Sequence, residues 1–313
     1  MEMKAEHRIE IKTVAIVGLG ALGILFGNHL SEKMPRQNLR IIADRDRISR
    51  YQEEQVFCNG KRCDFHYVAP EDQTGPADLV IFAVKYQNLQ EAIEAARHQV
   101  GEHTILLSAL NGISSEELLA QAFGAEKVLY CVAQGMDGIR EENRLNYANM
   151  GMLCFGDREP GIVSEQVERV ADFFRRTAFP HQIDPDMRRR LWGKFMMNVG
   201  VNQTAALFSC CYGGLQRAGT ARTMMISAMK EVLILSRLEG IFLSEDDLDY
   251  WLEVLFRLNP DGKPSMQQDM DAGRTTEVEL FSGTVLALSG KHGIVSPVNR
   301  AIYDAIREKE QKQ

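Results

Sequence analysis

The sequence has no C-x-x-C pair and no dense run of cysteines, although it contains six of them. Zinc sites and disulfide scaffolds both need several cysteines at short, regular spacings. The lack of such spacings excludes both classes and indicates reduced thiols without a metal centre. The six residues are Cys58, Cys63, Cys131, Cys154, Cys210 and Cys211.

The sequence also lacks an excess of positive charge. Its 36 lysines and arginines stand against 43 aspartates and glutamates, which gives a formal net charge of -7. Proteins that bind nucleic acid through the phosphate backbone present a broad basic surface. We therefore expect no nucleic-acid partner, and we interpret the basic cluster at residues 188–190 as the solvated start of a helix.

No apolar run is long enough to cross a membrane. The strongest candidate, residues 13–27, holds four glycines and stops short of the roughly 20 apolar residues that a spanning helix needs. Residues 1–6 are charged and polar, lack the apolar core of a signal peptide and are expected to be a frayed extension. We therefore expect a cytoplasmic protein with no membrane partner.

What the sequence does have is length and apolar content. Its 313 residues, of which 45% are hydrophobic and 25% charged, are sufficient for two globular domains with a large core. No internal repeat or low-complexity tract interrupts them.

Residues 13–27, TVAIVGLGALGILFG, are the most informative stretch of the first half. Residues 14–17 are β-branched or small without alternation, which is typical of a parallel strand buried on both faces. Gly18, Gly20 and Gly23 then form G-x-G-x-x-G and lead into an apolar helix. In this context the three glycines allow a tight turn, the approach of a pyrophosphate and close packing of helix on strand. The predicted dinucleotide loop comprises Gly18, Leu19, Gly20, Ala21, Leu22 and Gly23.

The residues just after the second predicted strand, 39–43, bear on whether the cofactor is NAD or NADP. Asp44 lies 21 residues beyond Gly23, near the offset at which an acid binds the ribose hydroxyls of NAD. Arg45 and Arg47 follow, and an arginine here can instead hold the 2′-phosphate of NADP. The residues alone leave this choice open.

Further strands are predicted at residues 77–84, 103–108, 127–133 and around 150–155, with a hairpin turning at Asn59-Gly60. Lys85 and Asn111 follow two of these strands. In open α/β sheets ligands bind beyond the carboxyl ends of the strands, so both residues fall where a cofactor or substrate would lie. The alternative is a solvated lysine and an ordinary Asn-Gly turn.

The character of the chain changes at Asp184-Pro185, because only helix-length patterns follow. We predict an α/β fold with a doubly wound Rossmann domain over residues 1–184 and an all-α domain over residues 185–313. The first helix of the second domain, residues 187–208, is apolar except for Lys194, Asn198 and Asn202, which share one helical face. A cation and two amides buried there need partners, so this face is expected to meet a wet cleft or a polar ligand. The alternative is that it meets bulk water.

Helices are also predicted at residues 220–238 and after Ser244, where Asp247 completes a capping box. Near the end, Ser265 lies in the segment PSMQQD and Glu277 opens another apolar helix. An acid at a helix start is often only a complement to the helix dipole.

Taken together, these motifs resemble the ketopantoate reductases, also called 2-dehydropantoate 2-reductases. The resemblance rests on GLGALG, Lys85 after a strand, LNG at residues 110–112, LWGKFMMNVGVNQTAAL, SMQQD and TTEVELFSG, and it covers about residues 13–307. It implies a cytoplasmic enzyme that reduces ketopantoate to pantoate with NADPH, on the route to pantothenate and coenzyme A, in a cleft between a Rossmann domain and a helical domain.

The resemblance also implies roles. Lys194 would be the catalytic lysine and Glu277 the acid that works with it, while Asn198, Asn202 and Ser265 would bind the substrate. Lys85 and Asn111 would lie near the nicotinamide, where Asn111 also meets the substrate, and the glycine loop would hold the pyrophosphate.

One departure concerns the cofactor. The family usually has Ala-Arg where the second strand ends, and this chain has Ala43-Asp44-Arg45. Asp44 at that place would repel a 2′-phosphate and admit NADH, whereas Arg45 would restore NADPH. The competing functions are a reductase of another 2-keto acid on the same plan and a non-catalytic dinucleotide sensor. A homodimer is compatible with the helical domain.

Overall fold

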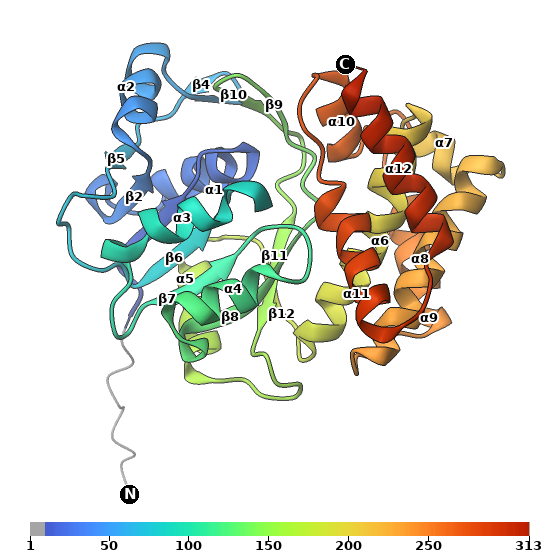
Figure 1. Cartoon of the computed structure of the whole chain (residues 1–313). Coiled ribbons are helices and arrows are strands. Elements are labelled where there is room, and N and C mark those ends of the chain that lie inside the picture. The colour runs from blue at the N-terminus through green and yellow to red at the C-terminus, as the bar shows by residue number, and fades with distance from the viewer. Residues whose placement is uncertain (1–9, 313) are drawn as a thin grey trace, which may run out of the picture. The chain divides into compact units, whose positions relative to one another are not determined.

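The computed structural model describes residues 10–312 and divides the chain into two compact units, Met1–Met187 and Arg188–Gln313 (Figure 1). The sequence places the boundary between residues 184 and 185. The polar start at residues 1–6, expected to be frayed, lies outside the described residues.

The first unit is built on an eight-stranded sheet in the order β12-β11-β8-β7-β6-β1-β2-β5. All neighbours pair in parallel except β11, which runs antiparallel to β8. Strand β1 lies between β2 and β6, so the strand order reverses there. This is the predicted doubly wound Rossmann arrangement, which is confirmed. The strands are β1 (Val14–Val17), β2 (Leu39–Ile42), β5 (His66–Val68), β6 (Leu79–Phe82), β7 (Ile105–Ser108), β8 (Val128–Gln134), β11 (Met152–Gly156) and β12 (His181–Ile183).

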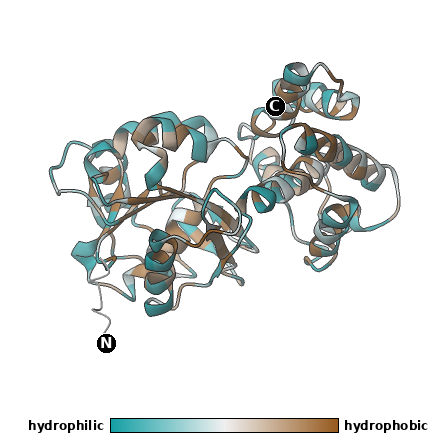
Figure 2. Ribbon diagram, turned by 90° about the horizontal axis from the view of Figure 1, so that it is seen from below, coloured by the Kyte–Doolittle hydropathy of each residue, from teal (hydrophilic) through white to brown (hydrophobic). Residues whose placement is uncertain are grey.

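Helices cover both faces of this sheet, which is why its central strands β1 and β6 are apolar without alternation (Figure 2). Val14 and Ile16 face one core, with α1 (Ala21–Ser31), α2 (Arg45–Glu54) and α5 (Glu165–Arg176). Ala15 and Val17 face the other, with α3 (Leu89–Ala95) and α4 (Ser115–Phe123). Short 3₁₀ turns complete the unit: η1 (Arg36–Asn38), η2 (Tyr86–Asn88), η3 (Arg97–Gln99) and η4 (Ala125–Lys127).

The predicted hairpin is confirmed. Strands β3 (Phe57–Cys58) and β4 (Lys61–Arg62) pair antiparallel across Asn59 and Gly60, whose φ values are 46° and 77°. The hairpin belongs to a second small sheet, β4-β3-β10-β9, completed by β9 (Ile139–Glu141) and β10 (Arg144–Asn146). The sequence analysis missed β9 and β10 because three-residue strands carry too little periodicity to recognise.

The second unit is all-helical, as predicted, and no strand follows β12 within residues 10–312. Helices α6 and α8 have the predicted bounds. Helix α6 lies close against α8 at Gly200 and close against α9 at Gly193. The elements are α6 (Met187–Phe208), α7 (Tyr212–Gln216), α8 (Thr220–Leu238), α9 (Glu245–Phe256), α10 (Ser265–Asp271), the π-helical η5 (Glu279–Gly283), α11 (Thr284–His292) and α12 (Pro297–Gln311).

Local signals explain where these helices begin. Ser244 and Asp247 form the predicted capping box at the start of α9, and Pro297 begins α12, where its missing N–H is not needed. Across the part of the chain that the structure describes, no helix combines the length and the apolarity needed to cross a bilayer.

The approach of α6 to α9 yields a stability prediction. A Cβ added at Gly193 would lie 2.2 Å from Nε1 of the buried Trp251. Gly193→Ala should therefore destabilise the second unit by about 1–3 kcal/mol through overpacking. Gly290→Ala is the matched control, because it also lies in a helix but a Cβ there meets nothing within 4 Å. The control should stabilise by about 0.5–1 kcal/mol. Denaturant unfolding of both variants tests this, and equal effects would contradict it.

Candidate functional site

The glycine turn between β1 and α1 has the geometry that a dinucleotide loop requires. Gly18 has φ +95°, and a Cβ there would lie 2.4 Å from Cγ1 of Val84. At Gly23 a Cβ would lie 2.1 Å from the carbonyl oxygen of Gly18, so only glycine lets α1 pack this close to the turn. Gly20 is the N-cap of α1.

The start of α1 is suited to an anion. Among the described residues, no side chain caps this end and no acid lies in its first turn. The first backbone N–H groups of a helix have no partner within it and carry the positive end of its dipole. A pyrophosphate therefore fits the turn formed by Gly18, Leu19, Gly20, Ala21, Leu22 and Gly23.

A cavity of about 310 Å³ lies at the carboxyl ends of β1 and β2. Gly18 and Leu19 of the glycine turn form part of its wall, and so do Asp44 and Arg47 from the start of α2. Its other lining residues are Val17, Ile42, Ala43, Tyr51, Pro70, Val84, Asn88, Glu91, Ala92, Glu94 and Ala95. This is the position at which a dinucleotide places its adenosine in the Rossmann fold.

The two residues predicted to govern the ribose are placed differently. Asp44 lines the cavity and caps α2, accepting a hydrogen bond from the backbone N–H of Arg47 at 2.7 Å. The Arg45 guanidinium pairs instead with Glu71, at 2.8 Å from its Oε1, and with Asp72. The hydrogen bond to Glu71 contributes most to raising the pKa of Arg45, and the hydrogen bond to Asp72 adds to it. Arg45 is not one of the described residues that line the cavity.

Lys85 and Asn111 both lie just beyond the carboxyl ends of neighbouring strands. Phe82 ends β6 and Ser108 ends β7, and these two residues are register partners in the parallel pair. Lys85 and Asn111 each follow three residues later and are half-buried. The fold thus puts both at the edge of the sheet where ligands bind.

Beneath the loop that carries Asn111 lies a buried carboxyl that the sequence analysis missed. The Ser108 hydroxyl accepts from the Leu110 N–H at 3.3 Å and donates to the Ser115 hydroxyl at 2.7 Å. Ser115 donates in turn to Oε2 of Glu116 at 2.9 Å. Burial raises the pKa of Glu116 to about 7, and its Oε1 finds no hydrogen-bond partner among residues 10–312. A glutamate followed by another glutamate on a helix gives no sequence signal of burial.

In the second unit, the structure brings three of the predicted substrate residues together. The Asn202 amide donates to Oδ1 of Asn198 at 3.1 Å, and the Ser265 hydroxyl donates to Oδ1 of Asn202 at 3.3 Å. Asn198 and Asn202 are 8% and 7% exposed, so this face of α6 does not simply meet bulk water. Lys194, one turn earlier, is half-buried.

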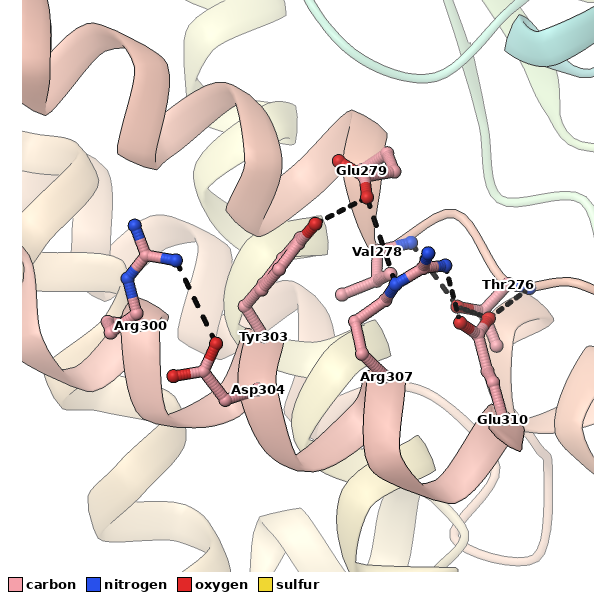
Figure 3. A network of polar contacts seen from close by, with 8 residues as sticks. All are labelled: Thr276, Val278, Glu279, Arg300, Tyr303, Asp304, Arg307 and Glu310. Atoms are coloured by element: carbon pink, nitrogen blue, oxygen red, sulfur yellow. Dashed lines mark hydrogen bonds and ion pairs between the residues drawn. The ribbon is translucent and has the colours of Figure 1, made fainter. Parts of the chain in front are cut away.

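Glu277 lies in the segment between α10 and η5, and its neighbours are fixed from α12 (Figure 3). The backbone N–H and the hydroxyl of the buried Thr276 both donate to Oε1 of Glu310, at 2.9 and 2.7 Å. On the other side of Glu277, the Tyr303 hydroxyl donates to Glu279 at 2.5 Å. Both ends of the short segment are therefore anchored to one helix.

The helix predicted to open at Glu277 begins instead at Glu279, and it begins as a π-helical turn. The buried Gln203 of α6 explains how this turn is held, because its Oε1 accepts from the Ser282 N–H at 3.1 Å. Turns of this kind occur frequently at functional sites. Residues 279–283 carry no sequence signal that separates a π-turn from an α-helix.

Comparison with known proteins identifies the protein family of this chain. The model of the family "Ketopantoate reductase PanE/ApbA" matches residues 14–160, and the model of its C-terminal domain matches residues 186–310. The chain belongs to the ketopantoate reductase PanE/ApbA family. It is therefore an oxidoreductase of that family.

Members of the ketopantoate reductase family align over nearly the whole chain. A 2-dehydropantoate 2-reductase of Streptococcus pyogenes serotype M3 is 26% identical, covering 95% of this chain and 97% of the relative. The crystal structure of a 2-dehydropantoate 2-reductase from Geobacter metallireducens is 26% identical, with a TM-score of 0.82, 95% of this chain covered and 99% of that one. A ternary structure of D-mandelate dehydrogenase with NADH and anilino(oxo)acetate shares the fold at 18% identity, with a TM-score of 0.84 and coverages of 96% and 98%.

The buried Glu116 yields a pH prediction. Its pKa is about 7 in the folded protein and 4.5 in the unfolded chain, so the folded state retains a proton that the unfolded state releases. The protonated Glu116 therefore contributes its full stability below about pH 4.5, and this contribution to the free energy of unfolding is lost as the pH rises from about 4.5 to about 7. Glu116→Gln should be more stable than the parent by roughly 3 kcal/mol at about pH 8 and equally stable at about pH 4. Denaturant unfolding across this range tests it, and a difference independent of pH would refute the burial argument.

Proposed function

We propose that this protein reduces 2-dehydropantoate to pantoate, a step of pantothenate and coenzyme A biosynthesis, with a nicotinamide dinucleotide as the hydride donor. The observation that carries the proposal is the hydrogen-bonded series Asn198, Asn202 and Ser265, whose two asparagines share one face of α6 with Lys194. Two buried amides beside a serine hydroxyl suit a substrate that offers a carboxylate and hydroxyl groups. Membership of the ketopantoate reductase family supports the same assignment.

Lys194 is proposed to act on the keto oxygen of the substrate. The bound nicotinamide supplies the hydride that the keto carbon accepts. Negative charge then gathers on the oxygen, where a protonated amine stabilises it and afterwards donates a proton. An ordinary lysine amine has a pKa of about 10.4 and is protonated at neutral pH, which is the form that this role requires.

Glu277 is proposed to keep Lys194 protonated or to bind a substrate hydroxyl. Its segment is anchored by Thr276 on one side and Glu279 on the other, so the carboxylate comes from a fixed backbone rather than a loose loop. A catalytic group held by its neighbours loses less entropy when the substrate binds.

The first unit is proposed to bind the cofactor. The glycine turn would hold the pyrophosphate at the start of α1, and the cavity beside Asp44 would hold the adenosine. Lys85 and Asn111, at the ends of β6 and β7, would lie near the nicotinamide, and Asn111 would also meet the substrate.

The substrate assignment is tested by turnover. The purified protein should oxidise the reduced dinucleotide rapidly with 2-dehydropantoate and slowly with other 2-keto acids. The panel should include phenylglyoxylate, because a D-mandelate dehydrogenase shares this fold and a fold does not fix a substrate. A higher kcat/KM with another acid would reassign the substrate, and dinucleotide binding without any turnover would favour a sensor.

The role of Lys194 is tested by substitution. Lys194→Ala should lower kcat about 10²- to 10⁴-fold, the usual contribution of a general acid, while dinucleotide affinity stays unchanged. Lys230→Ala is the matched control, because this lysine of α8 is exposed and pairs with Glu245. Near-normal turnover of Lys194→Ala with an unchanged pH profile would show that another group donates the proton.

A further inference from the structure

The cavity beside the glycine turn holds an arginine that already has two acidic partners. Arg47 Nε lies 3.2 Å from Oδ2 of Asp44, and its terminal nitrogen lies 3.6 Å from Oε1 of Glu91. All three residues line the cavity, Asp44 and Arg47 from the start of α2 and Glu91 from α3. One positive charge is therefore shared between two negative ones.

Two further charged groups near the cavity, Glu94 and Arg45, are each engaged in ion pairs. Glu94 also lines the cavity and is paired with Arg97, at 2.5 Å from Nε and 2.7 Å from a terminal nitrogen. Arg45 is engaged by Glu71 and Asp72 and does not line the cavity, as far as residues 10–312 show. Counting Asp44, Glu91 and Arg47 together with the neutral Glu94 and Arg97 pair, the cavity has an excess of negative charge.

Such a cavity distinguishes the two nicotinamide dinucleotides. They differ by a 2′-phosphate, which carries about -1.5 to -2 charges at neutral pH. A phosphate here would meet the Asp44 carboxylate, and the charge of the Arg47 guanidinium beside it is already offset by Asp44 and Glu91. A ribose hydroxyl would instead donate a hydrogen bond to the Asp44 carboxylate. The two carboxylate oxygens have room for this bond in addition to those from Arg47.

We propose that Asp44, Arg47 and Glu91 form a specificity element that selects NADH over NADPH. The proposal rests on the proposed function, since it assumes that the cavity receives the adenosine of the cofactor. It departs from the NADPH that the family resemblance implies. The departure arises because the residue in the position of the phosphate-binding arginine is an acid and the next arginine, Arg45, is turned to Glu71 and Asp72.

The experiment titrates the full-length protein with NADH and, separately, with NADPH in the absence of substrate. Isothermal titration calorimetry measures the two dissociation constants. We expect NADH to bind at least about tenfold more tightly. Equal affinities or a preference for NADPH would overturn the specificity element while leaving the proposed function intact. Failure of both dinucleotides to bind would overturn the proposed function itself.

One variant, with a matched control, tests the role of Glu91. Glu91→Gln leaves Arg47 with a single acidic partner, so the affinity for NADPH should rise about fivefold while that for NADH changes little. Asp46→Asn is the matched control, because it removes a carboxylate from an exposed position of α2 outside the described lining of the cavity and should leave the ratio of affinities unchanged.

Arg45→Ala separates this proposal from its alternative. If Arg45 held a 2′-phosphate, the variant would lose affinity for NADPH alone. Since Arg45 is bound to Glu71 and Asp72, we expect the ratio of the two affinities to stay as in the parent. A selective loss of NADPH binding in Arg45→Ala, or no effect of Glu91→Gln on NADPH, would overturn the role assigned to Arg47.

Discussion

The second unit depends on satisfying the amides that α6 carries into an apolar interior. Asn198, Asn202 and Gln203 are all buried, and a buried amide without hydrogen-bond partners is strongly destabilising. The Asn202 amide donates to Asn198 and accepts from the Ser265 hydroxyl, and the second bond fixes the start of α10 against α6. The Gln203 side chain accepts a hydrogen bond from the backbone N–H of Ser282, which fixes the π-helical turn that follows Glu277. The elements that bear the candidate catalytic residues are thus positioned by the same polar requirement.

The first unit depends on close backbone approach rather than on polar pairing. At Gly23 there is no room for a Cβ beside the Gly18 carbonyl, so α1 packs directly on the turn after β1. This contact aims the open N–H groups of α1 at the sheet edge where Lys85 and Asn111 also lie. An anion-binding geometry is therefore a consequence of glycine packing, and we propose that the charge around the nearby cavity selects between the two dinucleotides.

Charge pairing explains why neighbouring residues of one type have different roles. Arg45 and Arg47 are two residues apart at the start of α2, yet one pairs with Glu71 and Asp72 and the other faces Asp44 and Glu91. Glu116 and Glu117 are adjacent, yet one is fully buried and the other accepts from Tyr130 at the surface of α4. Such distinctions depend on residues distant in the chain.

The sequence by itself determined the Rossmann unit, the helical unit, the hairpin at Asn59-Gly60 and the bounds of α6 and α8, because each follows from local periodicity, glycine placement or turn chemistry. It also predicted which side chains of α6 share a face. Only the tertiary structure decided that Asn198, Asn202 and Ser265 are joined by hydrogen bonds, that Glu277 precedes a π-helical turn, and that Asp44 rather than Arg45 lines the cavity. The physical reason is that these hydrogen bonds and ion pairs join residues 26, 63 and 79 positions apart in the chain, beyond the reach of local sequence patterns.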